Sequence, residues 1–88
     1  MLLGKVVGKI VATVKAEKLN GKKILLVVPI DAEGKPSGKE VVSIDGVGAG
    51  IGDEVIVASG SAAKYIFEDK GTPIDSSIIA IVDVVEKR

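Results

Sequence analysis

Acidic residues that could act as general acid and base stand side by side at two places, Asp53-Glu54 and Glu68-Asp69. Neighbouring side chains of a strand point to opposite faces, so neither pair can converge on one reacting atom. A serine nucleophile would need a base, and the sequence contains no histidine. Ser61 with Lys64 would work only if the lysine were desolvated in a cleft. We therefore predict that these side chains are solvated and that none is catalytic.

Cysteine is absent as well, and Met1 is the only sulfur-containing residue. Disulfides, thiolate nucleophiles, zinc sites built from thiolates or imidazoles, and histidine proton shuttles are therefore excluded. We expect no cofactor, no metal and no enzymatic activity. An enzyme with its site at a subunit boundary stays open as an alternative, and it would have to work without histidine or cysteine.

A run of glycines, G-V-G-A-G-I-G at residues 46–52, resembles the start of a phosphate-binding loop. The dinucleotide fingerprint G-x-G-x-x-G needs a third glycine three residues after the second, and a helix that follows. Neither Gly46-x-Gly48 nor Gly48-x-Gly50 has that third glycine, and the run leads into a predicted strand. We predict instead that these glycines provide a positive φ or a close approach to another backbone.

The charge balance argues against nucleic acids and membranes as partners. Twelve Lys and Arg residues offset twelve Asp and Glu residues, so no long-range field attracts DNA, RNA or anionic lipid. Tyr65 and Phe67 lie on different faces of a predicted helix and form no stacking platform for bases. Lys5 and Lys9 interrupt the apolar start, and no apolar run approaches the ~18 residues of a membrane helix. We expect a soluble, cytoplasmic protein.

The 88 residues leave room for one small domain, which we expect to span residues 1–88. β-Branched and alternating stretches predict strands, and a segment capped by Ser61 predicts one short helix at 62–67. The predicted strands cover residues 5–15, 23–30, 40–45, 54–58 and 77–86. About five short strands and one helix predict an all-β protein with a small OB-like β-barrel. A helix between the fourth and fifth strands departs from the usual OB order.

Three of the predicted strands are apolar on both faces. Residues 24–28, 55–58 and 78–82 show no alternation, whereas such strands are normally covered by helices on both sides. One short helix cannot cover them, and a folded monomer of 9.0 kDa is expected to expose about 4,900 Å². We expect copies of the chain to bury these faces against each other. The candidate interface residues are Val7, Val11, Val27 and Ile79. The alternative is a tightly curled barrel that hides the same faces, with the helix plugging one end.

Four stretches of the sequence together resemble a known family. They are L-G-K-V-V-G-K-I-V-A-T at residues 3–13, L-L-V-V-P-I-D-A-E-G-K-P-S-G at 25–38, V-V-S-I-D-G-V-G-A-G-I-G-D-E-V-I-V-A-S-G-S-A-A-K at 41–64, and P-I-D-S-S-I-I-A-I-V-D at 73–83. Across residues 2–83 the chain resembles the EutN/CcmL family of bacterial microcompartment vertex proteins. The most specific part is residues 45–64, where the glycine run, the strand and the Ser-Gly-Ser-Ala-Ala step stand in the family's order.

The resemblance implies a cyclic homopentamer of small OB-like barrels at the five-fold vertices of a polyhedral shell in the cytoplasm, with hexameric shell proteins tiling the facets. Such shells enclose carbon fixation in carboxysomes, or ethanolamine, propanediol and related aldehyde metabolism. The implied role is structural, not enzymatic. Lys64 stands where the family often has arginine, which keeps the charge but loses a bidentate contact.

In a ring of five, the loop residues Gly48, Ala49 and Gly50 would converge near the axis and narrow or close a central pore. We hold this placement as a hypothesis. Two other classes of protein stay open, namely an OB-fold module that binds nucleic acid and an oligomeric binding module or scaffold without shell partners.

Overall fold

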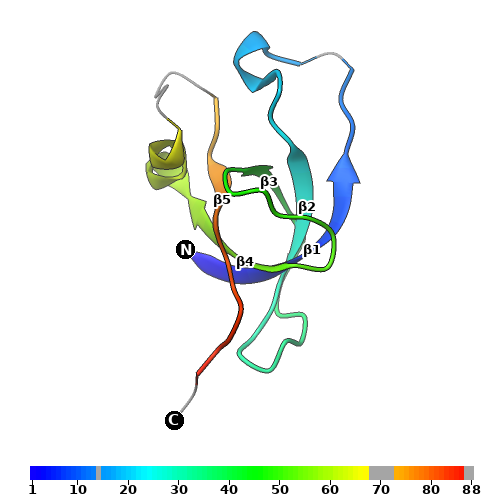
Figure 1. The fold of residues 1–88 in the computed structure, drawn as a ribbon, viewed down its shortest axis with the longest axis vertical. Helices are drawn as coiled ribbons and strands as arrows, with labels where there is room; N and C mark the ends of the chain where they lie inside the picture. The colour runs from blue at the N-terminus through cyan, green and yellow to red at the C-terminus, as the bar shows by residue number, and fades with distance from the viewer. Residues whose placement is uncertain (14, 68–72, 87–88) are drawn as a thin grey trace.

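The computed structural model describes residues 1–13, 15–67 and 73–86 and contains a closed five-stranded barrel in the order β1-β2-β3-β5-β4 (Figure 1). β3 and β5 are parallel, and the other neighbouring strands are antiparallel. The 3₁₀ helix η2 lies between β4 and β5. The elements are β1 (Leu2–Ile10), η1 (Glu17–Leu19), β2 (Ile24–Pro29), β3 (Val41–Asp45), β4 (Glu54–Ser59), η2 (Gly60–Ile66) and β5 (Ser76–Ile81). The predicted small β-barrel with one short helix is therefore confirmed.

The ends of the first and last strands differ from the prediction because their partner strands are short. β1 begins at Leu2, where it pairs with Val57 of β4, and it ends at Ile10, which pairs with the first residue of β2. The predicted extension of this strand to residue 15 finds no partner, and residue 14 lies outside the described residues. β5 ends at Ile81 instead of residue 86, because its partner β4 begins only one residue before Val55, which pairs with Ile81.

The helix begins earlier than predicted. Ser59, not Ser61, is the N-cap, and its side chain makes no capping hydrogen bond. Gly60 has a φ of +66°, which turns the chain sharply at the end of β4, and its N–H donates to the carbonyl oxygen of Asp75 at 2.8 Å. The turn at Gly60 therefore fixes where the helix starts, which the capping preference of serine alone could not show.

Aliphatic side chains fill the inside of the barrel. Alternate residues of β2 and β4 point inward, and the core consists of Val6, Leu25, Val27, Ala49, Val55, Val57 and Ile78, with Leu2 packed against it. Val27 pairs with Val6 across β1 and β2 and is 0% exposed in the single chain. The prediction that Val27 lies at a subunit interface is therefore wrong, since the barrel core already surrounds it.

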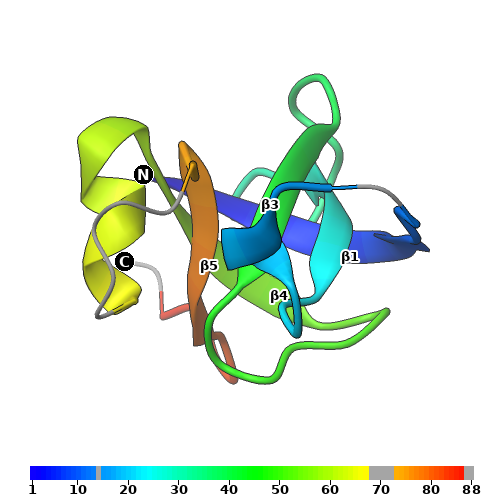
Figure 2. The same cartoon turned by 90° about the horizontal axis from the view of Figure 1, so that it is seen from above.

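A second cluster lies on the outside of the barrel. Ile44, Ala63 and Ile74 are buried there, together with the partly buried side chains of Leu19, Ile24 and Phe67. The Ser77 hydroxyl donates to the carbonyl oxygen of Ala63 at 2.6 Å and fastens η2 to β5. Figure 2 shows η2 beside the barrel wall. The alternative in which the helix plugs one end of the barrel is therefore wrong, because η2 covers the outer side of the sheet.

Candidate functional site

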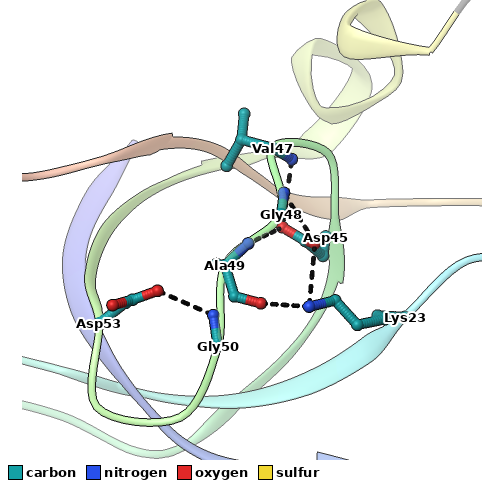
Figure 3. A network of polar contacts seen from close by, with 7 residues as sticks. All are labelled: Lys23, Asp45, Val47, Gly48, Ala49, Gly50 and Asp53. Atoms are coloured by element: carbon teal, nitrogen blue, oxygen red, sulfur yellow. Dashed lines mark hydrogen bonds and ion pairs between the residues drawn. The ribbon is translucent and has the colours of Figure 1, made fainter.

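The glycine run forms a loop whose first half is folded around the carboxylate of Asp45 (Figure 3). This side chain is only 5% exposed. Its oxygens accept hydrogen bonds from the backbone N–H groups of Val47 at 3.2 Å, Gly48 at 3.0 Å and Ala49 at 3.0 Å. Lys23 Nζ lies 3.6 Å from Oδ2 of Asp45 and also donates to the carbonyl oxygen of Ala49. One carboxylate and one ammonium group thus fix three successive peptide units.

The second half of the loop is joined to β1. Oδ2 of Asp53 accepts a hydrogen bond from the N–H of Gly50 at 2.8 Å, and the N–H of Asp53 donates back to Gly50 O at 3.1 Å. The N–H of Gly52 donates to Val6 O at 2.8 Å, and the N–H of Val6 donates to Asp53 O at 2.9 Å. The loop is therefore held by the chain itself.

The hydrogen bonds of the glycine loop argue against a phosphate-binding site. A phosphate-binding loop presents free backbone N–H groups to its ligand. Here the N–H groups of residues 47–50 are all donated to the carboxylates of Asp45 and Asp53, whose negative charge would also repel an anion. The loop is a rigid structural element and not a phosphate cradle.

The glycines serve the two purposes that the sequence predicts. Gly48 and Gly52 have φ values of +83° and +96°, a region that side chains other than glycine rarely adopt. Gly46 is needed for space, because a β-carbon there would lie 2.7 Å from Cδ1 of Ile66 and 3.0 Å from Ile78 O. The close approach of Gly46 is thus made to η2 and β5 of the same chain.

Gly46→Ala is expected to lower the free energy of unfolding by about 1–3 kcal/mol, because the added methyl group overpacks the contact with Ile66. Gly50→Ala is the matched control, since a β-carbon there meets only Oδ2 of Asp53, at 4.0 Å, and φ is not positive. Urea unfolding at equal protein concentration measures both. Equal urea midpoints for the two variants would show that η2 accommodates the added methyl group without a loss of stability.

The structure places the three predicted axis residues differently from one another. Ala49 is fully buried in the barrel core, whereas Gly48 is exposed and Gly50 half-buried. The side chain of Ala49 therefore has no surface with which to line a pore. The apolar side chains that the loop does present to solvent are those of Val47 and Ile51, which sequence reasoning did not single out.

The remaining predicted interface residues lie on three different parts of the surface. Val7 is 46% exposed at a bulge of β1, between Val6 and Gly8. Val11 is 80% exposed beyond the end of β1, in a hollow of about 230 Å³ whose lining includes four lysines. Ile79 is half-buried in β5. These residues do not form one patch.

Of the residues weighed for catalysis, Asp53 has a structural role in the described part of the chain. Oδ2 of Asp53 caps the glycine loop through the N–H of Gly50. Ser61 and Lys64 line an open hollow of about 620 Å³ beside η2. The pair Glu68-Asp69 lies outside the described residues.

The described residues contain neither a cluster of metal-ligating side chains nor a membrane-spanning helix. Within 1–13, 15–67 and 73–86, no three or more acidic side chains are grouped as a metal site would require. No helix in the same ranges has the length and apolar character needed to span a bilayer.

The chain exposes more surface than its size predicts. Its accessible area is 5591 Å², compared with the expected value of about 4,900 Å² for this mass. The exposed apolar side chains include Val7, Val42, Ile51 and Val84. Part of the apolar surplus predicted from the sequence is covered by η2, and part remains on the surface.

Comparison with known proteins gives consistent matches along the whole chain. The family described as "Ethanolamine utilisation protein EutN/carboxysome" matches residues 1–83. The bacterial microcompartment shell vertex protein EutN of Salmonella typhimurium is 44% identical over 85 residues, which cover 97% of this chain and 86% of that protein. The carboxysome shell vertex protein CcmL of Synechocystis sp. is 41% identical over 97% of this chain and 85% of its own length.

Solved structures agree with the sequence relatives. The GrpN pentameric microcompartment shell protein from Rhodospirillum rubrum superimposes with a TM-score of 0.90 at 42% identity, covering 100% of both chains. A pentameric shell protein from the RMM microcompartment superimposes with a TM-score of 0.81 at 28% identity.

Proposed function

Because the chain belongs to the EutN/CcmL family, we propose that it is a structural protein whose pentamers cap the five-fold vertices of a polyhedral bacterial microcompartment shell. The observation that carries this function is the match over nearly the whole chain to proteins named as shell vertex proteins. The pentameric relative that superimposes over its full length adds the number of subunits.

The physical features of the chain fit a structural role. The carboxylates of the glycine loop bind the chain's own backbone, and the loop is held at both ends. The relatives are shell proteins, so a structural role is favoured over an OB-fold module that binds nucleic acid. Catalysis forms no part of the proposed function.

The proposed partners are the hexameric proteins of the shell facets. Hexagonal tiles alone form a flat layer, and a closed polyhedron needs five-fold units at its corners. A rigid five-fold plug must therefore contact the edges of the surrounding tiles. At the centre of the plug, Gly48 lacks a side chain and is exposed, which would let five copies of the loop approach one another closely. A ring in which Gly48 lies far from the axis would contradict this placement.

Co-expression with a hexameric shell protein tests the function. We expect closed polyhedral particles with this chain, and open or elongated ones without it, as seen by electron microscopy. Native mass spectrometry of the chain alone should give a pentamer. Particles of the same shape in both cultures would contradict the vertex role, and a dominant monomer would contradict the pentamer.

A further inference from the structure

One uncovered apolar surface crosses three strands on the outside of the barrel. Leu26 of β2 pairs with Gly8 of β1 on one side and with Val42 of β3 on the other. Val42 is 52% exposed, Leu26 is half-buried, and Val7 stands beside Gly8 at the bulge. Gly8 has no side chain to cover Leu26, its partner in the register. We name the three side chains Val7, Leu26 and Val42 the apolar strip.

A second apolar surface lies around the C-terminal segment. Ile56 of β4 pairs with Leu3 of β1 and with Ala80 of β5 on the outer face. After Ile81 the chain leaves the barrel (Figure 1), and the N–H of Val82 donates to Glu54 O at 2.7 Å at the start of this segment. Between this segment and the barrel lies a groove of about 400 Å³, here called the tail groove. Its lining is Met1, Leu2, Leu3, Ile56, Val82, Val84 and Val85.

The strip and the tail groove lie on different sides of the barrel. β1 has two neighbours, β2 and β4, and the strip extends over β2 whereas the groove extends over β4. The outer side of β3 and β5 near η2 is already covered by the second cluster. The chain therefore presents two apolar surfaces that differ in composition and direction.

A ring needs two such surfaces on each subunit. In a cyclic oligomer other than a dimer, one patch of each subunit meets a different patch of its neighbour. The tail groove is shallow and lined by apolar side chains, and the apolar strip consists of aliphatic side chains that are exposed or half-buried in the single chain. The accessible area of 5591 Å² exceeds the expected value of about 4,900 Å² by an amount comparable to the ~800 Å² that one partner buries in a standard interface.

We infer that the apolar strip of one copy seats in the tail groove of the next copy around the ring. The inference rests on the proposed pentamer and names the two surfaces that build it. The occupant is a second copy of this chain, because two solved relatives of this fold are named as pentameric and each subunit of a ring needs a neighbour on two sides. The C-terminal segment that projects from the barrel forms the outer wall of the contact.

Single charges on each surface test the pairing. Val42→Glu and Val84→Glu are expected to abolish the pentamer and to give monomers of about 9.0 kDa in native mass spectrometry. Both positions are exposed in the single chain, at 52% and 72%, so the barrel itself should fold. Circular dichroism and the urea midpoint check the fold. Val42→Thr keeps the shape without the charge and should remain pentameric.

Val11→Glu is the matched control. Val11 is 80% exposed and lies outside both surfaces, beyond the end of β1, so this variant should remain pentameric. If Val11→Glu dissociates the ring while the Val42 and Val84 variants do not, the interface lies elsewhere and the inference is wrong.

Mixing the two variants tests whether the strip pairs with the groove. The Val42→Glu chain keeps an intact groove, and the Val84→Glu chain keeps an intact strip. With one variant isotopically labelled, the mixture should give a heterodimer with one labelled chain and no ring. The only contact between two intact surfaces is the strip of the Val84→Glu chain in the groove of the Val42→Glu chain. Mixed rings, or monomers alone, would overturn the inference.

The outcomes also separate this inference from the proposed function. If the unmodified chain is a monomer, the pentamer fails and the pairing fails with it. If the unmodified chain is a pentamer and the two charged variants remain pentameric, the proposed function stands and only the strip and groove pairing is overturned.

Discussion

Val27→Asp is expected to lower the free energy of unfolding by about 3–5 kcal/mol, because it places an unpaired carboxylate inside the barrel. Val27 is 0% exposed and is surrounded by other aliphatic side chains of the core. A domain of this size is stable by only about 5–15 kcal/mol, so the loss removes much of its stability. Aspartate is close to valine in size, so the effect reports the charge and not overpacking.

Urea unfolding, followed by circular dichroism at one fixed protein concentration, measures this loss. The concentration must be fixed because association adds to the apparent stability. Val11→Asp is the control, and as a surface change on an 80% exposed residue it should alter the free energy by about 0.5 kcal/mol or less. A Val27→Asp chain as stable as the control would mean that residue 27 does not face the barrel core.

Asp45→Ala is expected to lower the free energy of unfolding by about 3 kcal/mol, the second large effect. The change removes the acceptor of three backbone N–H groups and the partner of Lys23. Hydrogen bonds to charged groups contribute about 1.5–3 kcal/mol each, and water will satisfy the exposed N–H groups in part. The N–H of Ala49 is the least able to find water as a replacement acceptor, because Ala49 is buried in the core.

Asp31→Ala provides a matched control for Asp45→Ala. Asp31 also caps a loop, accepting from the N–H groups of Glu33 at 2.9 Å and Lys35 at 3.0 Å, but it is exposed. We expect Asp31→Ala to lower the free energy of unfolding by about 1 kcal/mol. Amide hydrogen exchange should accelerate at residues 47–50 in Asp45→Ala and not in Asp31→Ala. Equal losses in the two variants would show that Asp45 does not organise the loop.

These two residues support the proposed function in different ways. Val27 maintains the barrel, and Asp45 maintains a loop whose backbone bonds leave it little freedom. A vertex subunit must hold one shape while it contacts copies of itself and neighbouring tiles. We therefore expect Asp45→Ala to weaken assembly as well, because a loosened loop makes ring closure entropically more costly.

The sequence was sufficient for the class of the protein and for the chemistry that it lacks. The absence of histidine and cysteine spoke against thiolate and imidazole chemistry, and the balanced charge spoke against polyanionic partners, without any knowledge of the fold. The β-branched stretches identified the five strands of the described residues, because local propensity and apolar content depend on neighbouring residues alone. The spacing of Gly46 to Gly52 already spoke against a dinucleotide loop, and the structure adds that the carboxylates of Asp45 and Asp53 occupy its N–H groups.

Only the tertiary structure decided which apolar residues are inside. Val27 and Val42 look alike in the sequence, but one is in the core and the other is on the surface. Alternation tells which residues of a strand share a face, whereas the closure of the barrel and the bulge at Val7 determine which face is inward. Strand ends likewise depend on the length of the partner strand. The apolar strip and the tail groove follow from these long-range pairings. The residue pattern of one strand does not show which strand will pair with it.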